Sequence, residues 1–316
     1  MNRRRSLPTP ASIAAAALVL LALAACTAGS GATPPPSVAP TGSPGPSTPP
    51  GAIAHPTGPT DLVLRITVDG GFTGPGWDLR RIPVISIYGD GTVISEGPQI
   101  EIYPPPALPS IVAARMTEAG LQEVLAAAQA AGLLGPDRTL DAPGIADAPF
   151  TTIVVNAGGS VHTTTVYALG EAEGSSVEIP AEEKAARREI LDFTAKLSDR
   201  ANWLGDELGP DAQYAYDTMR IYSLPATPPV DGSVGGDENL PPSYADWPLE
   251  PGLARFGNAL ASGMNYRCGT ITGKDLEEFL PVAQKTSWET YWRSEGSTYQ
   301  LILRPLLPDE SGCPTS

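Results

Sequence analysis

Two pairs of acidic residues are the first candidates for chemistry in this sequence. Glu171 and Glu173 lie two residues apart, and Asp237 and Glu238 are adjacent. Glycoside hydrolysis uses two carboxyl groups, one as general acid and the other as base or nucleophile. Both pairs lie in stretches whose Gly and Ser content is typical of loops, which favours solvated surface charge. A carboxylate-based hydrolase is therefore kept as the alternative function.

The two histidines, His55 and His162, give little basis for catalysis or metal binding. His162 lies in an alternating stretch, residues 161–165, on its polar face, so we expect a structural or solvated histidine. The sequence contains no Gly-x-Ser-x-Gly and no His-Glu-x-x-His motif. The acidic loop 231–238 lacks the ligand spacing of an EF-hand. The sequence thus predicts no catalytic residue, no metal site and no cofactor.

The first 26 residues have the order of a bacterial export signal. Three arginines at positions 3–5 precede an apolar run, residues 13–23, which is too short to span a bilayer as a helix. The run ends in Leu23-Ala24-Ala25-Cys26, which resembles the lipobox of bacterial lipoproteins. The resemblance implies that residues 1–25 are a signal peptide and that the Cys26 sulfur carries a diacylglyceryl group. The alternative is an ordinary signal peptide, in which Cys26 is incidental.

A lipid on Cys26 would anchor the chain to the outer face of the cytoplasmic membrane, because two acyl chains suffice for stable attachment. Two cysteines then remain, Cys268 and Cys313. The extracytoplasmic compartment permits disulfides, so we predict that these two residues pair. Their bond would close a loop of about 45 residues, worth about 4 kcal/mol in the chain-entropy description. The alternative, a Cys/Cys metal site, lacks histidine partners.

Residues 26–60 are predicted to be the lipidated cysteine and a disordered tether. Positions 27–60 are rich in Pro, Gly, Ser, Thr and Ala and contain no acidic or basic residue, so they cannot form a core. His55 lies in this tether and is expected to be solvated. Removal of residues 1–25 takes three arginines away and changes the formal net charge from −15 to −18. Nucleic acid and anionic lipid headgroups repel such a chain, so neither is an expected ligand.

Alternating apolar patterns, glycine-containing turns and amphipathic helices predict an α+β fold, with antiparallel sheets and helices on one face. We expect the folded body to begin at Asp61, with a first strand that alternates apolar and polar residues. The predicted elements are hairpins over 83–95, 152–169 and 288–303, a strand over 214–224, and helices that begin near Thr117, Pro180 and Thr272.

Two of the predicted helices begin alike. Residues 116–129 and 271–284 share a threonine at the predicted N-cap, a core leucine and an Ala-Gln step. A hairpin follows each helix. We therefore hypothesise two related strand–helix–hairpin modules, residues 61–205 and 206–316. The alternative is coincidence between two ordinary amphipathic helices.

The last hairpin carries four aromatic residues: Trp288, Tyr291, Trp292 and Tyr299. Most of them are expected to contribute to the core. The hairpin is nevertheless the first candidate for an exposed interaction surface, because it concentrates aromatic side chains.

The turn at 88–94 and the helix start at 272–276 resemble those of uncharacterised secreted lipoproteins from actinobacterial-type, high-GC genomes. That resemblance implies location and architecture and brings no functional residue. We expect a non-enzymatic binding or interaction protein of the cell envelope, whose partner is an envelope protein, a glycan or a small ligand. A carboxylate with a raised pKa in a deep cleft would favour the hydrolase, whereas a shallow aromatic patch would favour binding.

Overall fold

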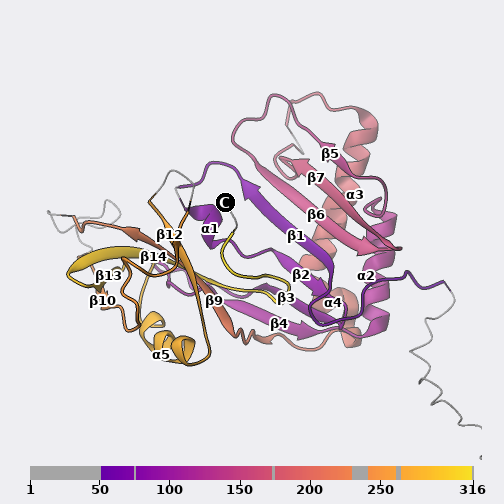
Figure 1. Ribbon diagram of the computed structural model, residues 1–316. Coiled ribbons are helices and arrows are strands. Elements are labelled where there is room, and N and C mark those ends of the chain that lie inside the picture. Colours follow the sequence, from indigo (N-terminus) through magenta and orange to yellow (C-terminus); the bar gives the residue numbers. More distant parts are fainter. Residues whose placement is uncertain (1–50, 75, 173–174, 230–240, 261–264, 315–316) are drawn as a thin grey trace, which may run out of the picture. The chain divides into compact units, whose positions relative to one another are not determined.

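Two sheets and five α-helices are formed by the residues that the computed structural model describes (Figure 1). These residues are 51–74, 76–172, 175–229, 241–260 and 265–314, and all fall within one unit, residues 48–316. Both sheets are mostly antiparallel, which confirms the predicted α+β class. Cys26, the predicted signal peptide and most of the predicted tether lie outside the described residues.

The larger sheet has eight strands in the order β5-β7-β6-β1-β2-β3-β4-β8. Neighbouring strands are antiparallel except for β5 and β7, which are parallel. The strands are β1 (Leu62–Gly70), β2 (Ile85–Tyr88), β3 (Thr92–Glu96), β4 (Ile111–Arg115), β5 (Arg138–Leu140), β6 (Pro149–Ala157), β7 (Ser160–Tyr167) and β8 (Ala212–Gln213).

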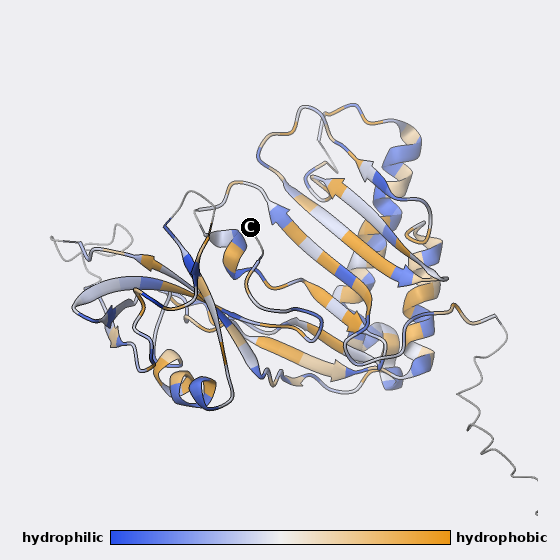
Figure 2. Cartoon of the chain, in the orientation of Figure 1, coloured by the Kyte–Doolittle hydropathy of each residue, from blue (hydrophilic) through white to orange (hydrophobic). Residues whose placement is uncertain are grey.

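Helices α2 (Glu118–Ala130) and α3 (Ala181–Ser198) cover one face of this sheet (Figure 1). Both helices are amphipathic, and the strands of this sheet alternate between hydrophobic and more hydrophilic residues (Figure 2). The short helix α4 (Arg200–Leu204) follows α3. The buried helix residues include those that the sequence pattern predicts: Leu121, Val124, Leu125, Ala128, Ile190, Phe193 and Leu197.

The smaller sheet has six strands in the order β10-β13-β14-β9-β12-β11. Helix α5 (Gly273–Ala283) packs on it through Leu276, Phe279 and Ala283. Phe279 stacks on Trp292 with ring centroids 5.3 Å apart. The strands are β9 (Thr218–Pro225), β10 (Tyr244–Asp246), β11 (Asn258–Ala259), β12 (Arg267–Thr272), β13 (Tyr291–Ser294) and β14 (Ser297–Pro305).

The hypothesis of two related modules does not agree with the strand orders. After α2, the first strand of the hairpin, β6, joins the sheet beside β1, whereas after α5 it is the second strand, β14, that joins beside β9. The helix starts also differ, because Thr117 accepts a hydrogen bond from the Gly120 amide and Thr272 makes no side-chain cap. The predicted boundary between the modules, at residues 205 and 206, also does not separate the two sheets. Strand β8 lies after this boundary and still belongs to the larger sheet.

The face of the larger sheet opposite α2 and α3 is partly covered by the segment after β14. Leu307 is buried there against Tyr88, Ile94 and Ile111. Helix α1 (Trp77–Arg80), in the β1–β2 connection, contacts β14. The predicted disulfide is confirmed: Cys268 on β12 is bonded to Cys313, which ties the end of this segment to the smaller sheet.

The predicted start of the folded body at Asp61 is wrong, because residues 51–60 already pack on the larger sheet and α2. The Ile53 amide donates to Gln122 Oε1 over 2.8 Å, and Gln122 Nε2 donates back to the Ile53 carbonyl over 3.0 Å. His55 is not solvated: its side chain is 5% exposed and its Nε2 lies 3.1 Å from Glu118 Oε1. The composition of these residues is typical of a disordered tether. They are ordered nevertheless, because individual hydrogen bonds fix their backbone.

Candidate ligand-binding site

Most of the aromatic side chains on the last hairpin are buried, as expected, so they do not form an exposed interaction surface as a group. Trp292 is 1% exposed, Tyr299 5% and Tyr291 7%. Trp292 packs between Trp247 and Phe279, so it belongs to the core beneath α5. Trp288 is half-buried, with the guanidinium of Arg80 4.0 Å from its ring centroid. These side chains stabilise the smaller sheet, and they are not available as a shared interaction surface.

The other residues with possible chemistry are scattered. His162 Nδ1 lies 2.7 Å from the Gly135 carbonyl oxygen, as a structural histidine would. Glu171 is exposed, while Glu173 and the acidic loop 231–238 lie outside the described residues. Within the described ranges, no group of three His, Cys, Asp or Glu side chains could hold a metal ion.

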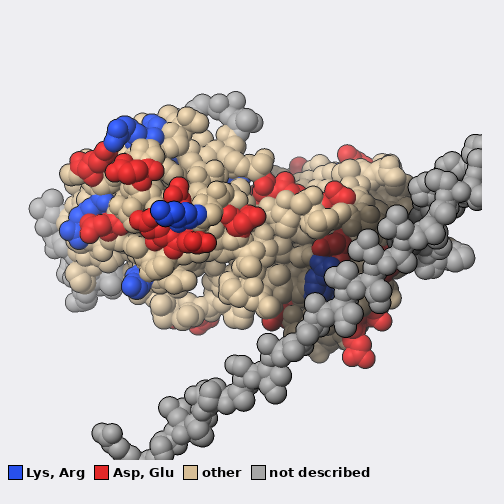
Figure 3. Space-filling model, turned by 60° about the horizontal axis from the view of Figure 1, so that its bottom comes forward, with Lys and Arg blue, Asp and Glu red and all other residues tan. Residues whose placement is uncertain are grey.

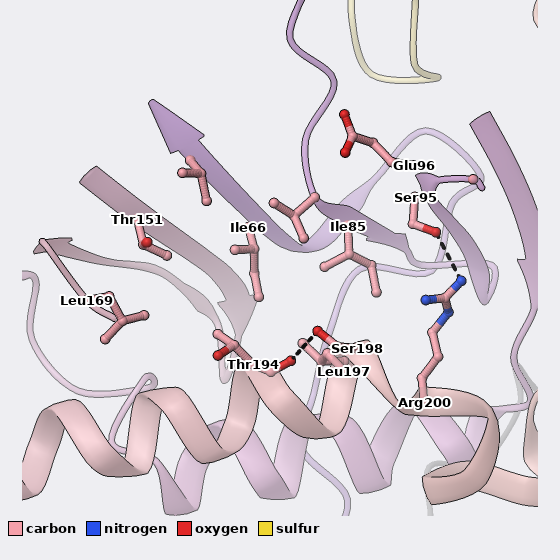
Figure 4. Close-up of a pocket in the computed structure, with 13 residues that line it drawn as sticks. Ile66, Ile85, Ser95, Glu96, Thr151, Leu169, Thr194, Leu197, Ser198 and Arg200 are labelled. Carbon is pink, nitrogen blue, oxygen red and sulfur yellow. Dashed lines mark hydrogen bonds between the residues drawn. The ribbon is translucent and has the colours of Figure 1, made fainter. Parts of the chain in front are cut away.

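A pocket of about 450 Å³ lies between α3 and the strands β1, β2, β3 and β6 (Figure 4). We call it the α3 pocket. Ile66 and Ile85 point from the sheet toward the helix, and Thr194, Leu197 and Ser198 face them from α3 (Figure 4). Its volume falls in the range of small-molecule sites. The aliphatic lining residues are Ile66, Val68, Val84, Ile85, Leu169 and Leu197.

The hydroxyl groups contributed by α3 are already satisfied within that helix. Thr194 Oγ1 donates to the Leu191 carbonyl over 2.9 Å, and Ser198 Oγ donates to the Thr194 carbonyl over 3.0 Å. These two side chains therefore add mainly carbon surface to the pocket wall. The result is a cavity of mixed character, with an aliphatic wall and polar groups that come mainly from the sheet side and from α4.

Arg200 supplies the positive charge of the pocket. It extends from the start of α4 toward β3, where Nη2 donates to Ser95 Oγ over 3.0 Å (Figure 4). The same nitrogen is 3.0 Å from Asp211 Oδ2. Arg200 Nε is buried and has no hydrogen-bond partner among the described residues. That nitrogen is closed to solvent, so a ligand in the pocket would meet the other part of the Arg200 side chain, which as a whole is 15% exposed.

Glu96 is the one carboxylate among the lining residues that the structure describes. It follows Ser95 at the end of β3 and lies above the sheet, away from α3 (Figure 4). Partial burial raises the pKa of the Glu96 carboxyl above its ordinary value. The carboxylate therefore takes up a proton more readily than a solvated one, and its charge at the pocket is pH-dependent.

The α3 pocket was not predicted from the sequence. Ile66 and Leu197 were identified as core residues, because periodicity reports which face is inward and does not report imperfect closure of a helix over a sheet. Arg200 and Ser95 are 105 residues apart. The only sequence signal was an arginine just beyond an amphipathic helix, which is a common feature of helix ends.

The chain matches no family model, no curated protein and no solved structure in comparisons with known proteins. The geometry of the site and the chemistry of its residues therefore carry the functional argument. No helix among the described residues is both long enough and apolar enough to cross a membrane. The Cys268–Cys313 disulfide indicates an oxidising, extracytoplasmic setting.

Proposed function

We propose that this chain is a lipid-anchored extracytoplasmic protein that binds a small amphipathic molecule in the α3 pocket. The ligand has an apolar body and an anionic or oxygen-rich head. The observation that carries the proposal is the pairing of six aliphatic lining residues with the partly exposed side chain of Arg200, the one cationic residue in the described lining. Binding sites of this kind combine an apolar wall with a few polar groups that fix orientation.

The location of the protein rests on two features. The disulfide supports an extracytoplasmic setting, and the lipobox-like sequence before Cys26 supports a lipid anchor at the outer face of the cytoplasmic membrane. In that position the protein meets molecules that cross or surround the membrane. Many such molecules are amphipathic, which agrees with the lining of the pocket.

Binding is tested with the full chain carrying Cys26→Ser, which prevents lipid attachment and allows work without detergent. The probe is the anionic dye 1-anilinonaphthalene-8-sulfonate, followed by fluorescence. Decanoate and decylammonium, which share a ten-carbon body and differ in charge, are used as competitors. We expect decanoate to displace the dye better, because Arg200 offers an N–H donor to a carboxylate.

Thr194→Trp fills the pocket and is expected to lower the affinity for the dye by at least about tenfold. Ala195→Trp, at the next and exposed position of α3, is the matched control and should bind normally. Near-ultraviolet circular dichroism checks that both variants fold. Equal binding by the two tryptophan variants, or better displacement by decylammonium, would contradict the proposed site.

A carboxylate-based hydrolase is the second candidate, because Glu96 is a carboxyl group with a raised pKa at a pocket. Glycoside hydrolysis by the two usual geometries requires a second carboxyl group within about 5–10 Å. The test is release of reducing ends from cell-wall polysaccharide by the full chain. Activity that Glu96→Gln abolishes would favour this candidate over binding.

A further inference from the structure

A second depression lies between the two sheets, beside the short connection from β8 to β9. It has a volume of about 530 Å³, and its walls come from the β3–β4 connection, the β8–β9 connection and α5. We call it the Tyr groove, after Tyr214 and Tyr216 in its floor. A neighbouring depression of about 390 Å³ shares the same two tyrosines but is also lined by Asp217 and Glu310, so it is not counted as part of the groove.

The Tyr groove has no charged residue among its described lining residues, although the chain as a whole carries a formal net charge of −15. Its polar lining consists of carboxamide, hydroxyl and phenol groups. Ile100, on the rim, is 67% exposed, so the groove is open to solvent and uncovered on that side. On the face that Figure 3 presents, acidic and basic side chains are interspersed. A charged ligand would lose hydration in the groove without gaining an opposite charge.

Two glutamines in the lining have their amide nitrogens occupied and their oxygens free. Gln99 Nε2 donates to the Gly97 and Ser110 carbonyls, each over 3.3 Å. Gln213 Nε2 donates to the Ile111 carbonyl over 3.1 Å. Within the described chain, neither Oε1 atom has a protein partner. Gln284, Ser110 and Tyr216 add groups that can also donate, so the groove suits a ligand whose groups both donate and accept hydrogen bonds, as sugar hydroxyls do.

The two tyrosines supply flat aromatic surface beside these acceptors. Their ring centroids are 6.2 Å apart, with planes tilted by 44°. Tyr214 is fixed, because its hydroxyl donates to the Leu306 carbonyl over 3.1 Å. Tyr216 is half-buried against the core of the smaller sheet. Aromatic faces are electron-rich and attract weakly positive C–H groups, such as those on one face of a sugar ring.

We propose that the Tyr groove binds a neutral glycan, with sugar rings against Tyr214 and Tyr216 and sugar hydroxyls donating to Gln99 and Gln213. A proline-rich peptide also fits aromatic grooves. It brings carbonyl acceptors and few N–H donors, because proline has no amide hydrogen. The free acceptors of the groove therefore favour a polyhydroxylated ligand. This site is separate from the α3 pocket and does not depend on its function.

Isothermal titration of the full Cys26→Ser chain with defined oligosaccharides tests the proposal. The probes are cellotetraose, maltotetraose and N-acetylchitotetraose, which are neutral, and tetragalacturonate, which is anionic. We expect at least one neutral probe to bind, and to bind at least about tenfold tighter than tetragalacturonate. No binding of any neutral probe at millimolar concentration would overturn the proposal, as would equal binding of the anionic one.

Variants assign the binding to the groove. Tyr216→Ala is expected to weaken the neutral probe by at least about tenfold, and Gln213→Ala by about threefold to tenfold. Tyr244→Ala and Gln129→Ala, at exposed positions outside the groove, are the matched controls. The pocket-filling Thr194→Trp should leave glycan binding unchanged. Unchanged binding by Tyr216→Ala and Gln213→Ala, both folded by circular dichroism, would contradict the assignment, and a shared loss with Thr194→Trp would mean one common site.

Discussion

Arg65, on β1, binds the segment after β14 to the larger sheet, on the face opposite α2 and α3. Its Nη1 and Nη2 donate to the two carboxylate oxygens of Asp309 over 2.9 and 2.7 Å. The Tyr88 hydroxyl donates to Asp309 as well, over 2.7 Å. Burial acts to raise the pKa of the Asp309 carboxyl, but the bonds from Arg65 and Tyr88 outweigh it and hold that pKa below its ordinary value. Two-point contact of this kind is among the stronger ion pairs in proteins.

Asp309→Asn should therefore destabilise the chain by about 2 kcal/mol at pH 7, because it leaves Arg65 half-buried without its carboxylate. A depressed pKa stabilises the fold above the pKa of the unfolded carboxyl, about 3.9, and this contribution is lost as the pH falls through the lower, folded value. Urea denaturation should thus show a difference between variant and parent that is largest near pH 7 and that shrinks as the pH is lowered below about 4.

The matched control for this prediction is Asp246→Asn. Asp246 lies 3.4 Å from Arg293, but its side chain is 82% exposed. Its loss should change stability by less than about 0.5 kcal/mol, as for other exposed ion pairs. Equal effects of the two substitutions would argue that Arg65 and Asp309 contribute no more than a surface pair.

Single residues were predictable from the sequence where counting or periodicity applied. Cys268 and Cys313 could be paired because only one other cysteine exists. Arg65 and Asp309 could not, because they are 244 residues apart and each alone resembles an ordinary surface charge. The position of Trp292 on a hairpin could be predicted from the local sequence. Its burial could not, because it depends on α5 and on Trp247, which come from other segments of the chain.

At the scale of elements, the long amphipathic helices and glycine-turn hairpins were predicted and found. They carry local signals: Thr117 caps α2, and Gly91 takes a φ of 84° in the β2–β3 turn. The two-residue strands β8 and β11 were missed, because two residues cannot show a period of two. The same limit applies to residues 51–60, which have no repeating pattern and are held by individual hydrogen bonds.

The disulfide joins β12 to the segment after β14. Replacing both cysteines, Cys268→Ser with Cys313→Ser, should lower the free energy of unfolding by about 2–4 kcal/mol, because the unfolded chain gains freedom. Hydrogen exchange should accelerate most strongly in residues 305–314. Thermal unfolding and exchange mass spectrometry measure the two effects. An unchanged melting temperature would show that the buried Leu307 and the bonds of Arg65 suffice to hold the segment.

At the scale of the whole molecule, the prediction concerns attachment to the membrane. The chain expressed in a bacterium with lipoprotein processing should sediment with the membrane fraction, and Cys26→Ser should move it to the soluble extracytoplasmic fraction. The physical reason is that two acyl chains bind a bilayer stably, whereas the acidic folded body has no attraction to anionic lipid.

The control is Cys268→Ser with Cys313→Ser. It replaces two cysteines instead of one and should leave the chain in the membrane fraction. Mass spectrometry of the N-terminal peptide measures the lipid directly. A parent chain whose N-terminal peptide lacks the mass of a diacylglyceryl group would contradict lipid anchoring through Cys26.

If the chain is exported with its amino terminus first, as the signal-like start of the sequence predicts, Arg65 reaches the far side of the membrane long before Asp309. The strands of the larger sheet can pair while the later residues are still in transit, but the open face keeps an unneutralised guanidinium and uncovered apolar side chains until Leu307 and Asp309 arrive. During this interval an exported chain would be most open to proteases and to aggregation. The interval would end only when Leu307 and Asp309 have arrived and Cys313 has been oxidised.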